Sequence, residues 1–207
     1  MKRTSRLALG WALGVAALAA PVRADIGLSL AYVDLGGQPY ARFKNFVDQA
    51  VAGNPGYGFS ATDAAYMYKL TGQAQYSTLA IAWVEDQVTA AEAEIALGNR
   101  PAIAGDSYLD VGPMLRDVAL VYDWCYPLLT PQQRTRWEAY ADQAVWNVWN
   151  HNSASWGGHP FPWSGWSVDN PGNNYHYSFL EATMYWGFAA DRQNWIDFLA
   201  NVKLPAV

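Results

Sequence analysis

Apolar residues recur at helical spacing along most of the chain, and the pattern is clearest between residues 130 and 149. There the apolar positions are three and four residues apart, which predicts a helix with one broad buried face. They are Trp137, Tyr140, Ala141, Ala144, Val145, Val148 and Trp149. Thr130, Pro131 and Gln133 come just before them. Because these three residues form a capping box with proline at the first helical position, we expect the helix to begin there.

Other segments show the same spacing or end at glycine and proline residues that stop a helix. The predicted helices span about 40–52, 60–72, 74–97, 109–124, 130–149, 174–190 and from 194 onward. No segment shows sustained strand alternation, so we predict an all-α fold. Short connections imply antiparallel helix pairs, either in an α-solenoid or in an α/α toroid. Because no repeat of fixed period is visible, we favour part of an incomplete α/α toroid.

The first residues have a different pattern. Three basic residues, Lys2, Arg3 and Arg6, precede an apolar run over 7–20 that is too short to span a membrane. The apolar run is followed by residues 22–24, which end in Ala24 and have the form of a signal-peptide cleavage site. These features predict a secretory signal over residues 1–24 and a periplasmic or secreted protein. No later apolar segment is long enough to span a membrane, so we expect no membrane partner after the signal is removed.

The remaining residues, 25–207, suffice for one helical domain. Removing the signal takes away four of the 13 basic residues and leaves all 18 acidic ones, a formal charge of about −9. This excludes the basic surface of a nucleic-acid-binding protein, and long-range repulsion argues weakly against an anionic ligand. The single cysteine, Cys125, lies in an apolar helical stripe. We therefore predict a buried side chain there rather than a nucleophile.

The chain contains 11 tryptophans and 13 tyrosines, and several tryptophans gather in the segment 151–172. This segment is too long and too aromatic for a simple connection. Binding residues collect on loops, and flat aromatic rings suit the apolar faces of pyranose sugars. We therefore predict that Trp163, Trp166 and His159 bind substrate on a loop over a groove. The alternative is that some of these rings, with Trp156, fill the core.

The next segment places Asn173-Asn174-Tyr175-His176-Tyr177 at the start of the sixth predicted helix. Asparagine is a good N-cap, so capping alone is the simpler interpretation of these amides. A helix N-terminus also offers free N–H groups and the positive end of the helix dipole, where a carboxylate is held favourably. The segment is therefore a candidate binding site for an acidic sugar.

This segment resembles the Asn-Asn-His motif of the alginate lyase and heparinase II/III-like polysaccharide lyases. Upstream, residues 115–124 and the Thr130-Pro131 turn are similar to the helix and turn before that motif, so the resemblance covers about residues 106–197. The family implies an incomplete α/α toroid, often followed by a β-sandwich, and β-elimination on a uronic-acid polymer of the alginate or glycosaminoglycan type. An asparagine amide neutralises the uronate, and a histidine or tyrosine removes the proton on the adjacent carbon.

By position, the resemblance makes Asn174 the neutralising amide, Asn173 and Tyr177 substrate contacts, and Tyr175 or His176 the base. In the family the histidine follows the second asparagine directly, whereas here Tyr175 comes between them. One residue turns a helix by about 100°, so Tyr175 and His176 cannot easily face one cleft, and the base assignment stays open. The later arginine- and tyrosine-bearing segment of the family does not occur. We therefore expect a chain truncated at its C-terminal end, which as a fragment can be inactive.

Two other functions remain open. A glycoside hydrolase on an α/α barrel would need two carboxylates, and Asp169 with Asp123, Asp110 or Glu181 are the candidates. A non-catalytic carbohydrate-binding module would need only the aromatic loop. The three histidines lack the spacing of metal ligands, so we expect no metal and no cofactor. In the leading hypothesis the partner is an anionic polysaccharide, with no nucleic acid.

Overall fold

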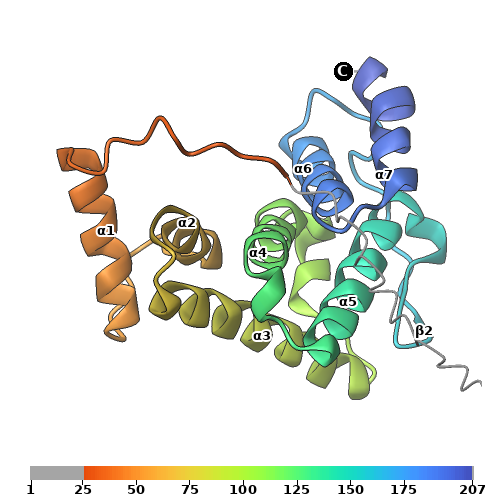
Figure 1. The fold of residues 1–207 in the computed structure, drawn as a ribbon. Coiled ribbons are helices and arrows are strands. Elements are labelled where there is room, and N and C mark those ends of the chain that lie inside the picture. The colour runs from red at the N-terminus through yellow and green to blue at the C-terminus, as the bar shows by residue number, and fades with distance from the viewer. Residues whose placement is uncertain (1–25, 207) are drawn as a thin grey trace, which may run out of the picture.

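The computed structural model describes residues 26–206 and confirms that this part of the chain is all-α (Figure 1). The predicted signal over residues 1–24 lies outside the described residues. The described helices are α1 (Gln38–Val51), α2 (Ala61–Thr71), α3 (Ala74–Ala96), α4 (Val111–Trp124), α5 (Pro131–Trp149), α6 (Asn174–Ala189) and α7 (Gln193–Phe198), which continues into the short turns η5 (Leu199–Lys203) and η6 (Leu204–Ala206). Between α5 and α6, two-residue strands β1 (Ser155–Trp156) and β2 (His159–Pro160) pair in antiparallel.

The helix boundaries largely follow the predicted ones. The Thr130 side chain accepts from the backbone N–H of Gln133 at 3.1 Å, and the Gln133 side chain accepts from the backbone N–H of Thr130 at 3.0 Å. The predicted capping box is therefore confirmed. Gly72 ends α2 in the left-handed conformation, with φ 69°, which glycine adopts without strain. The fourth helix begins at Val111 rather than at the predicted residue 109. A left-handed turn over residues 106–108 precedes it.

The helices form two layers (Figure 1). α2, α4 and α6 lie side by side on the inside, with α1, α3, α5 and α7 around them. Two contacts show that α4 and α6 run in the same direction. The backbone N–H of Gly112 donates to Ser178 Oγ, and one turn later on both helices Arg116 pairs with Glu181. A Cβ at Gly112 would lie 2.8 Å from the Ser178 carbonyl oxygen, so the close approach requires glycine. The starts of α4 and α6 therefore lie at the same end of the inner layer.

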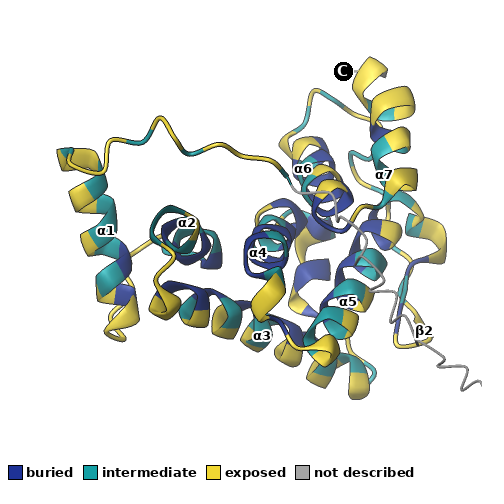
Figure 2. Cartoon of the chain, in the orientation of Figure 1, coloured by how far each residue is buried: buried dark blue, intermediate teal, exposed yellow. Residues whose placement is uncertain are grey.

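The core lies between the two layers, as the buried faces in Figure 2 show. The rings of Trp137 on α5 and Trp186 on α6 are completely buried. The predicted burial of Cys125 is confirmed, and this burial raises the pKa of its thiol to about 12, which keeps the thiol protonated. Within residues 26–206, no helix combines the length and the apolar character that crossing a membrane requires.

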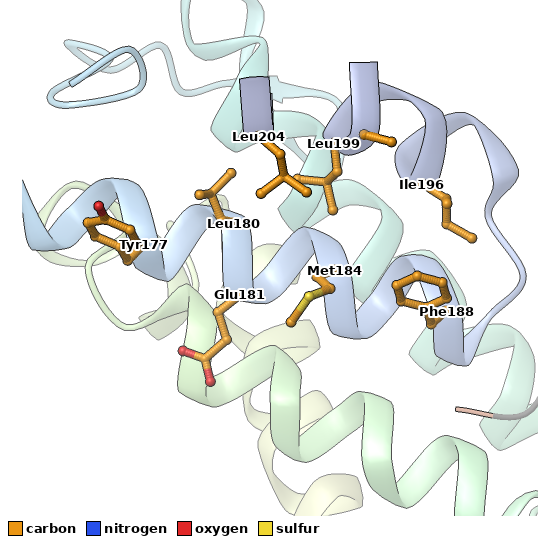
Figure 3. Close-up of a pocket in the computed structure, with 9 residues that line it drawn as sticks. Tyr177, Leu180, Glu181, Met184, Phe188, Ile196, Leu199 and Leu204 are labelled. Atoms are coloured by element: carbon orange, nitrogen blue, oxygen red, sulfur yellow. The ribbon is translucent and has the colours of Figure 1, made fainter. Parts of the chain in front are cut away.

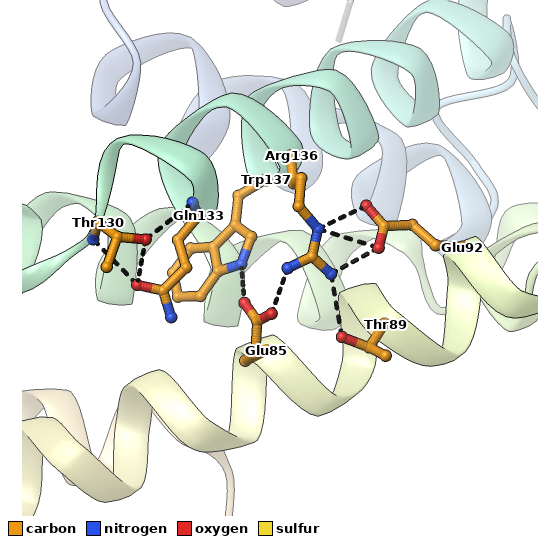
Figure 4. A network of polar contacts seen from close by, with 7 residues as sticks. All are labelled: Glu85, Thr89, Glu92, Thr130, Gln133, Arg136 and Trp137. Carbon is orange, nitrogen blue, oxygen red and sulfur yellow. Dashed lines mark hydrogen bonds and ion pairs between the residues drawn. The ribbon is translucent and has the colours of Figure 1, made fainter.

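A cluster of polar contacts joins α3 to α5 (Figure 4). The Arg136 guanidinium donates from Nε to both carboxylate oxygens of Glu92, at 2.9 and 3.0 Å, and from a terminal nitrogen to Thr89 Oγ1 at 3.0 Å. It also pairs with Glu85, which accepts from the Trp137 indole N–H at 2.9 Å. Burial acts to raise the pKa of Glu85, but the hydrogen bonds from Arg136 and Trp137 outweigh it, so this pKa is lowered.

We expect Arg136→Met to lower the free energy of unfolding by about 1 kcal/mol at neutral pH, because it removes the partner of two partly exposed carboxylates and keeps an apolar stem. Since the pKa of Glu85 is lowered in the folded state, its stabilising effect is present above the unfolded-state pKa and is lost as the pH falls through the folded-state pKa. The difference between wild type and variant should therefore shrink in acid. Urea unfolding at neutral and acidic pH measures it, and an equal difference at both would contradict the ion-pair explanation.

Candidate functional site

The start of α6 holds two asparagines in different roles. Asn173 is the N-cap, and its side chain accepts from the backbone N–H of Tyr175 at 3.0 Å. Asn174 occupies the first helical position and is exposed, and its side chain makes no hydrogen bond within residues 26–206. Capping thus falls to Asn173 alone. The Asn174 amide is left free at a helix N-terminus, where the N–H groups and the helix dipole favour an anion.

Tyr175 is half-buried and lies beside the segment that precedes α4. Its hydroxyl lies beside the carboxylate of Asp106, with Asp110 close by. Partial loss of solvent and these two carboxylates raise the pKa of Tyr175, because they oppose a negative phenolate. Tyr175 is therefore a neutral phenol near neutral pH, suited to donate a proton rather than to accept one.

Asp106 belongs to a strained turn. Asp106, Ser107 and Tyr108 all have positive φ, at 38°, 52° and 63°. Residues other than glycine avoid this left-handed region, at a cost of about 1–2 kcal/mol each. The buried Tyr108 hydroxyl, which accepts from the Trp156 indole N–H at 3.2 Å, anchors one side of the turn. The Ser178 hydroxyl on α6 donates to the carbonyl oxygen of Leu109, the residue just after the turn. Strain of this kind clusters at functional sites.

A polar hollow of about 470 Å³ adjoins this turn. Its lining includes Arg100, Gly105, Asp106 and Ser107. A guanidinium can hold a carboxylate through two parallel hydrogen bonds, so Arg100 gives the hollow a group suited to an acidic sugar. We refer to Asp106, Asp110, Asn174 and Tyr175 together as the α4–α6 site, and Arg100 lines the hollow that adjoins its Asp106.

His176 faces the interior instead. It is 2% exposed, and its Nδ1 lies 3.2 Å from the carbonyl oxygen of Ser167. Because a carbonyl can only accept, Nδ1 carries the proton and a neutral ring keeps a lone pair on Nε2. This Nε2 is buried without a partner among the described residues. The ring packs edge-on against Trp149, while Tyr177 is half-exposed. His176 is therefore shielded from a ligand in this conformation, on a different side of α6 from Tyr175.

The aromatic loop divides between packing and exposure. Trp156 is only 2% exposed and packs in the core beside Tyr108. The prediction that this segment covers a groove is therefore wrong for the Trp156 ring. Trp163 is half-buried, with its ring 5.2 Å from that of Tyr108. Trp166 is 57% exposed, and His159 is exposed on β2. Of the predicted sugar platforms, Trp166 is thus the most accessible and Trp163 offers only part of its ring.

Three of the four carboxylates considered for a hydrolase, Asp169, Glu181 and Asp123, already have partners. Asp169 pairs with Lys203 at 2.6 Å, and Glu181 pairs with Arg116 at 2.8 Å. Asp123 accepts from a backbone N–H of the segment before α1. The hydrogen bond from Lys203 lowers the pKa of Asp169, whereas the acid of a glycosidase needs a raised one. This arrangement gives the hydrolase alternative no support at Asp169.

An apolar groove of about 300 Å³ runs between α6 and the C-terminal turns (Figure 3). Leu180, Met184, Phe188, Ile196, Leu199 and Leu204 line it. The Glu181 carboxylate points away from it, toward α4 (Figure 3). Because sugar hydroxyls need hydrogen-bond partners, this groove is not suited to a carbohydrate.

Sequence reasoning missed Arg100 and Asp106. The Gly105-Asp106-Ser107 stretch does signal a turn before a helix. Nothing in the linear sequence, however, indicates that this turn lies beside Tyr175, about 70 residues away.

We expect Tyr175 to titrate above its ordinary pKa and Asp106→Asn to shift that titration to lower pH, because the substitution removes the negative charge that opposes the phenolate. The measurement is the absorbance of tyrosinate against pH, taken as the difference between each protein and its Tyr175→Phe counterpart. A titration curve that is the same with Asp106 and with asparagine would contradict the contact.

Comparisons with protein-family models, with curated proteins and with solved structures found no match for this chain. Within residues 26–206, no group of three histidine, cysteine, aspartate or glutamate side chains is placed to bind a metal ion.

Proposed function

We propose that the two layers are part of an incomplete α/α toroid. α2 and α4 run in the same direction, because Thr62 bonds to Asp117 and, further along, the ring of Tyr66 lies 6.0 Å from that of Trp124. The inner helices α2, α4 and α6 are thus parallel, and each is followed by an outer helix. The outer helices lie around them along an arc (Figure 1). The apolar groove on α6 is the kind of surface on which a further helix of a toroid would pack.

We propose that the protein is a polysaccharide lyase that cleaves a uronic-acid polymer by β-elimination. The observation that carries this proposal is the free Asn174 amide at the N-terminus of α6, next to the neutral phenol of Tyr175. In the proposal, one bound sugar contacts both side chains, a carboxylate-binding group and a proton donor, from consecutive positions at the start of α6. Elimination beside a carboxylate needs both.

Carboxylate binding is the first requirement. The proton on the carbon next to a uronate carboxylate is very weakly acidic until the carboxylate charge is offset and the developing enediolate is stabilised. In the proposal, the Asn174 side-chain amide contacts the carboxylate near the positive end of the α6 dipole, and Arg100 adds a cation in the adjoining hollow. The exposed ring of Trp166 offers a stacking surface for a neighbouring sugar.

Proton movement is the second requirement. A base takes the proton from C5, the C5–H electrons form the C4–C5 double bond, and the C4–O bond breaks. We assign Tyr175 as the acid that protonates the departing oxygen, because its phenol carries a proton near neutral pH and lies at the start of α6 next to Asn174 in the sequence. His176 is the candidate base, because its Nε2 keeps a lone pair. It can act only if the segment around Ser167 moves and opens the ring to substrate.

The test is to incubate the purified protein with alginate, heparan sulfate and chondroitin sulfate. Elimination creates an unsaturated uronate that absorbs in the ultraviolet, together with new reducing ends. Reducing ends without this absorbance would mean hydrolysis and would overturn the proposal. Binding of a polymer without either product would favour a non-catalytic module.

We further propose that the protein is exported and begins at Asp25 after cleavage. The intact mass of protein recovered from the periplasm or medium of its host should correspond to residues from 25 onward. Recovery only from the cytoplasm, with residues 1–24 retained, would contradict export.

A further inference from the structure

A second hollow, of about 500 Å³, lies on the outer layer between α5 and α7. Its lining includes Asp142, Gln143, Trp146, Arg192, Asn194 and Trp195. We refer to these six residues as the α5–α7 hollow. It differs from the apolar groove on α6, because both indole rings and polar side chains line it.

The two tryptophans have the features of a sugar platform. Trp146 is 37% exposed on α5, and Trp195 is half-buried at the start of α7. Neither indole N–H has a hydrogen-bond partner within residues 26–206. A large ring with a free polar edge fits the mixed character of a pyranose, which has apolar C–H faces and a rim of hydroxyls. Elsewhere in the described part, five indole N–H groups are bonded, those of Trp137, Trp149, Trp156, Trp163 and Trp186, whereas those of Trp83, Trp124 and Trp166 are not.

Hydrogen-bonding groups around the rings remain available. The exposed Asn194 amide makes no side-chain hydrogen bond within the described residues. Gln143 donates from Nε2 to Asn147, which leaves its Oε1 able to accept. These groups supply both donors and acceptors, as sugar hydroxyls require.

The Arg192 and Asp142 side chains in the hollow are held by a network of hydrogen bonds. Arg192 donates to both carboxylate oxygens of Asp142, at 3.0 and 2.8 Å, and to Glu138 at 3.0 Å. Asp142 also accepts from the Trp186 indole N–H at 2.7 Å. Since these side chains are already held, a ligand would not have to order them, which favours binding.

The charges around Arg192 favour a neutral ligand over an anionic one. One guanidinium, that of Arg192, is shared by two carboxylates, those of Asp142 and Glu138. Within the lining Arg192 balances Asp142, so the hollow has no free cation to hold a uronate, and the Glu138 carboxylate bonded to Arg192 adds negative charge that opposes one. We propose that the α5–α7 hollow binds a neutral saccharide chain through Trp146 and Trp195.

This site is separate from the α4–α6 site. Arg192 and Asn194 follow the C-terminal end of α6, whereas Asn174 and Tyr175 lie at its start. A helix of 16 residues is about 24 Å long, so the two sites lie at opposite ends of α6. The proposal therefore does not depend on lyase activity.

The test is native electrophoresis in gels that contain a soluble β-glucan, a xylan, a galactomannan or alginate. We expect retardation by at least one neutral polymer. Trp146→Ala and Trp195→Ala should each weaken the apparent affinity by at least about tenfold, because such rings dominate binding energy. Trp146→Phe, which keeps a ring, should retain part of the binding, and Asn194→Ala should weaken it without a change in thermal midpoint.

Two variants are matched controls. Trp83 on α3 is also 37% exposed, so Trp83→Ala should leave retardation by the neutral polymer unchanged. Asn174→Ala should leave it unchanged as well. The proposal is overturned if no neutral polymer retards the wild type, if Trp83→Ala weakens retardation as much as Trp146→Ala does, or if the Trp146 and Trp195 variants alter only the oligomeric state.

Discussion

Replacing Asn174 by alanine is expected to lower kcat on a polyuronate by about 10²-fold, the scale of losing one donor to a developing oxyanion. The thermal midpoint should stay within about 2 °C, because an exposed side chain without partners contributes little stability. Steady-state kinetics and thermal unfolding on the same preparation give both values.

Asn173→Ala is the matched control, one residue away. It removes the side chain that caps α6, so it should cost about 1 kcal/mol of unfolding free energy and lower the midpoint by about 2–4 °C. The kcat of the folded fraction should be nearly intact. If Asn174→Ala leaves kcat within about twofold of wild type, Asn174 does not stabilise the transition state.

Trp156→Ala is expected to give the largest loss of stability, about 3–5 kcal/mol, because it opens a cavity where a ring that is 2% exposed was packed. For a domain of this size the thermal midpoint should fall by roughly 10 °C or more. The Tyr108 hydroxyl also loses its donor, so the strained turn beside Tyr175 loosens and kcat should fall as well.

Trp166→Ala is the control within the same loop. Its ring is 57% exposed, so the free energy of unfolding should change by no more than about 0.5 kcal/mol. Its expected effect is a higher KM, because the proposal stacks a sugar of the substrate on this exposed ring. Equal midpoints for the two alanine variants would show that Trp156 is not a core residue in solution.

The helices could be predicted because their signals are local. The spacing of apolar residues, the Thr130 capping box and the glycine at 72 each act within a few residues of the boundary they set. The all-α class follows from these alone. The start of α6 at Asn174 was predictable in the same way, because the residue before it, Asn173, is of a type that favours the N-cap position.

The contacts between distant segments could not be predicted. A ring such as Trp156 looks the same in the sequence whether it covers a groove or fills the core, and only its packing against Tyr108 decides. The pairing of Tyr175 with Asp106 depends on two segments that meet only after α4 and α6 pack together. One feature of the site was predictable: the Tyr175 and His176 side chains point in different directions, because consecutive residues on a helix are about 100° apart.

The central claim is that cleavage occurs by elimination, and the mass of the products from a defined oligouronate tests it most directly. Elimination adds nothing to the substrate, so the two product masses should sum to the substrate mass, and one product should carry the unsaturated ring. Hydrolysis adds one water molecule across the cleaved bond. Products whose masses together exceed the substrate by one water would contradict the lyase mechanism.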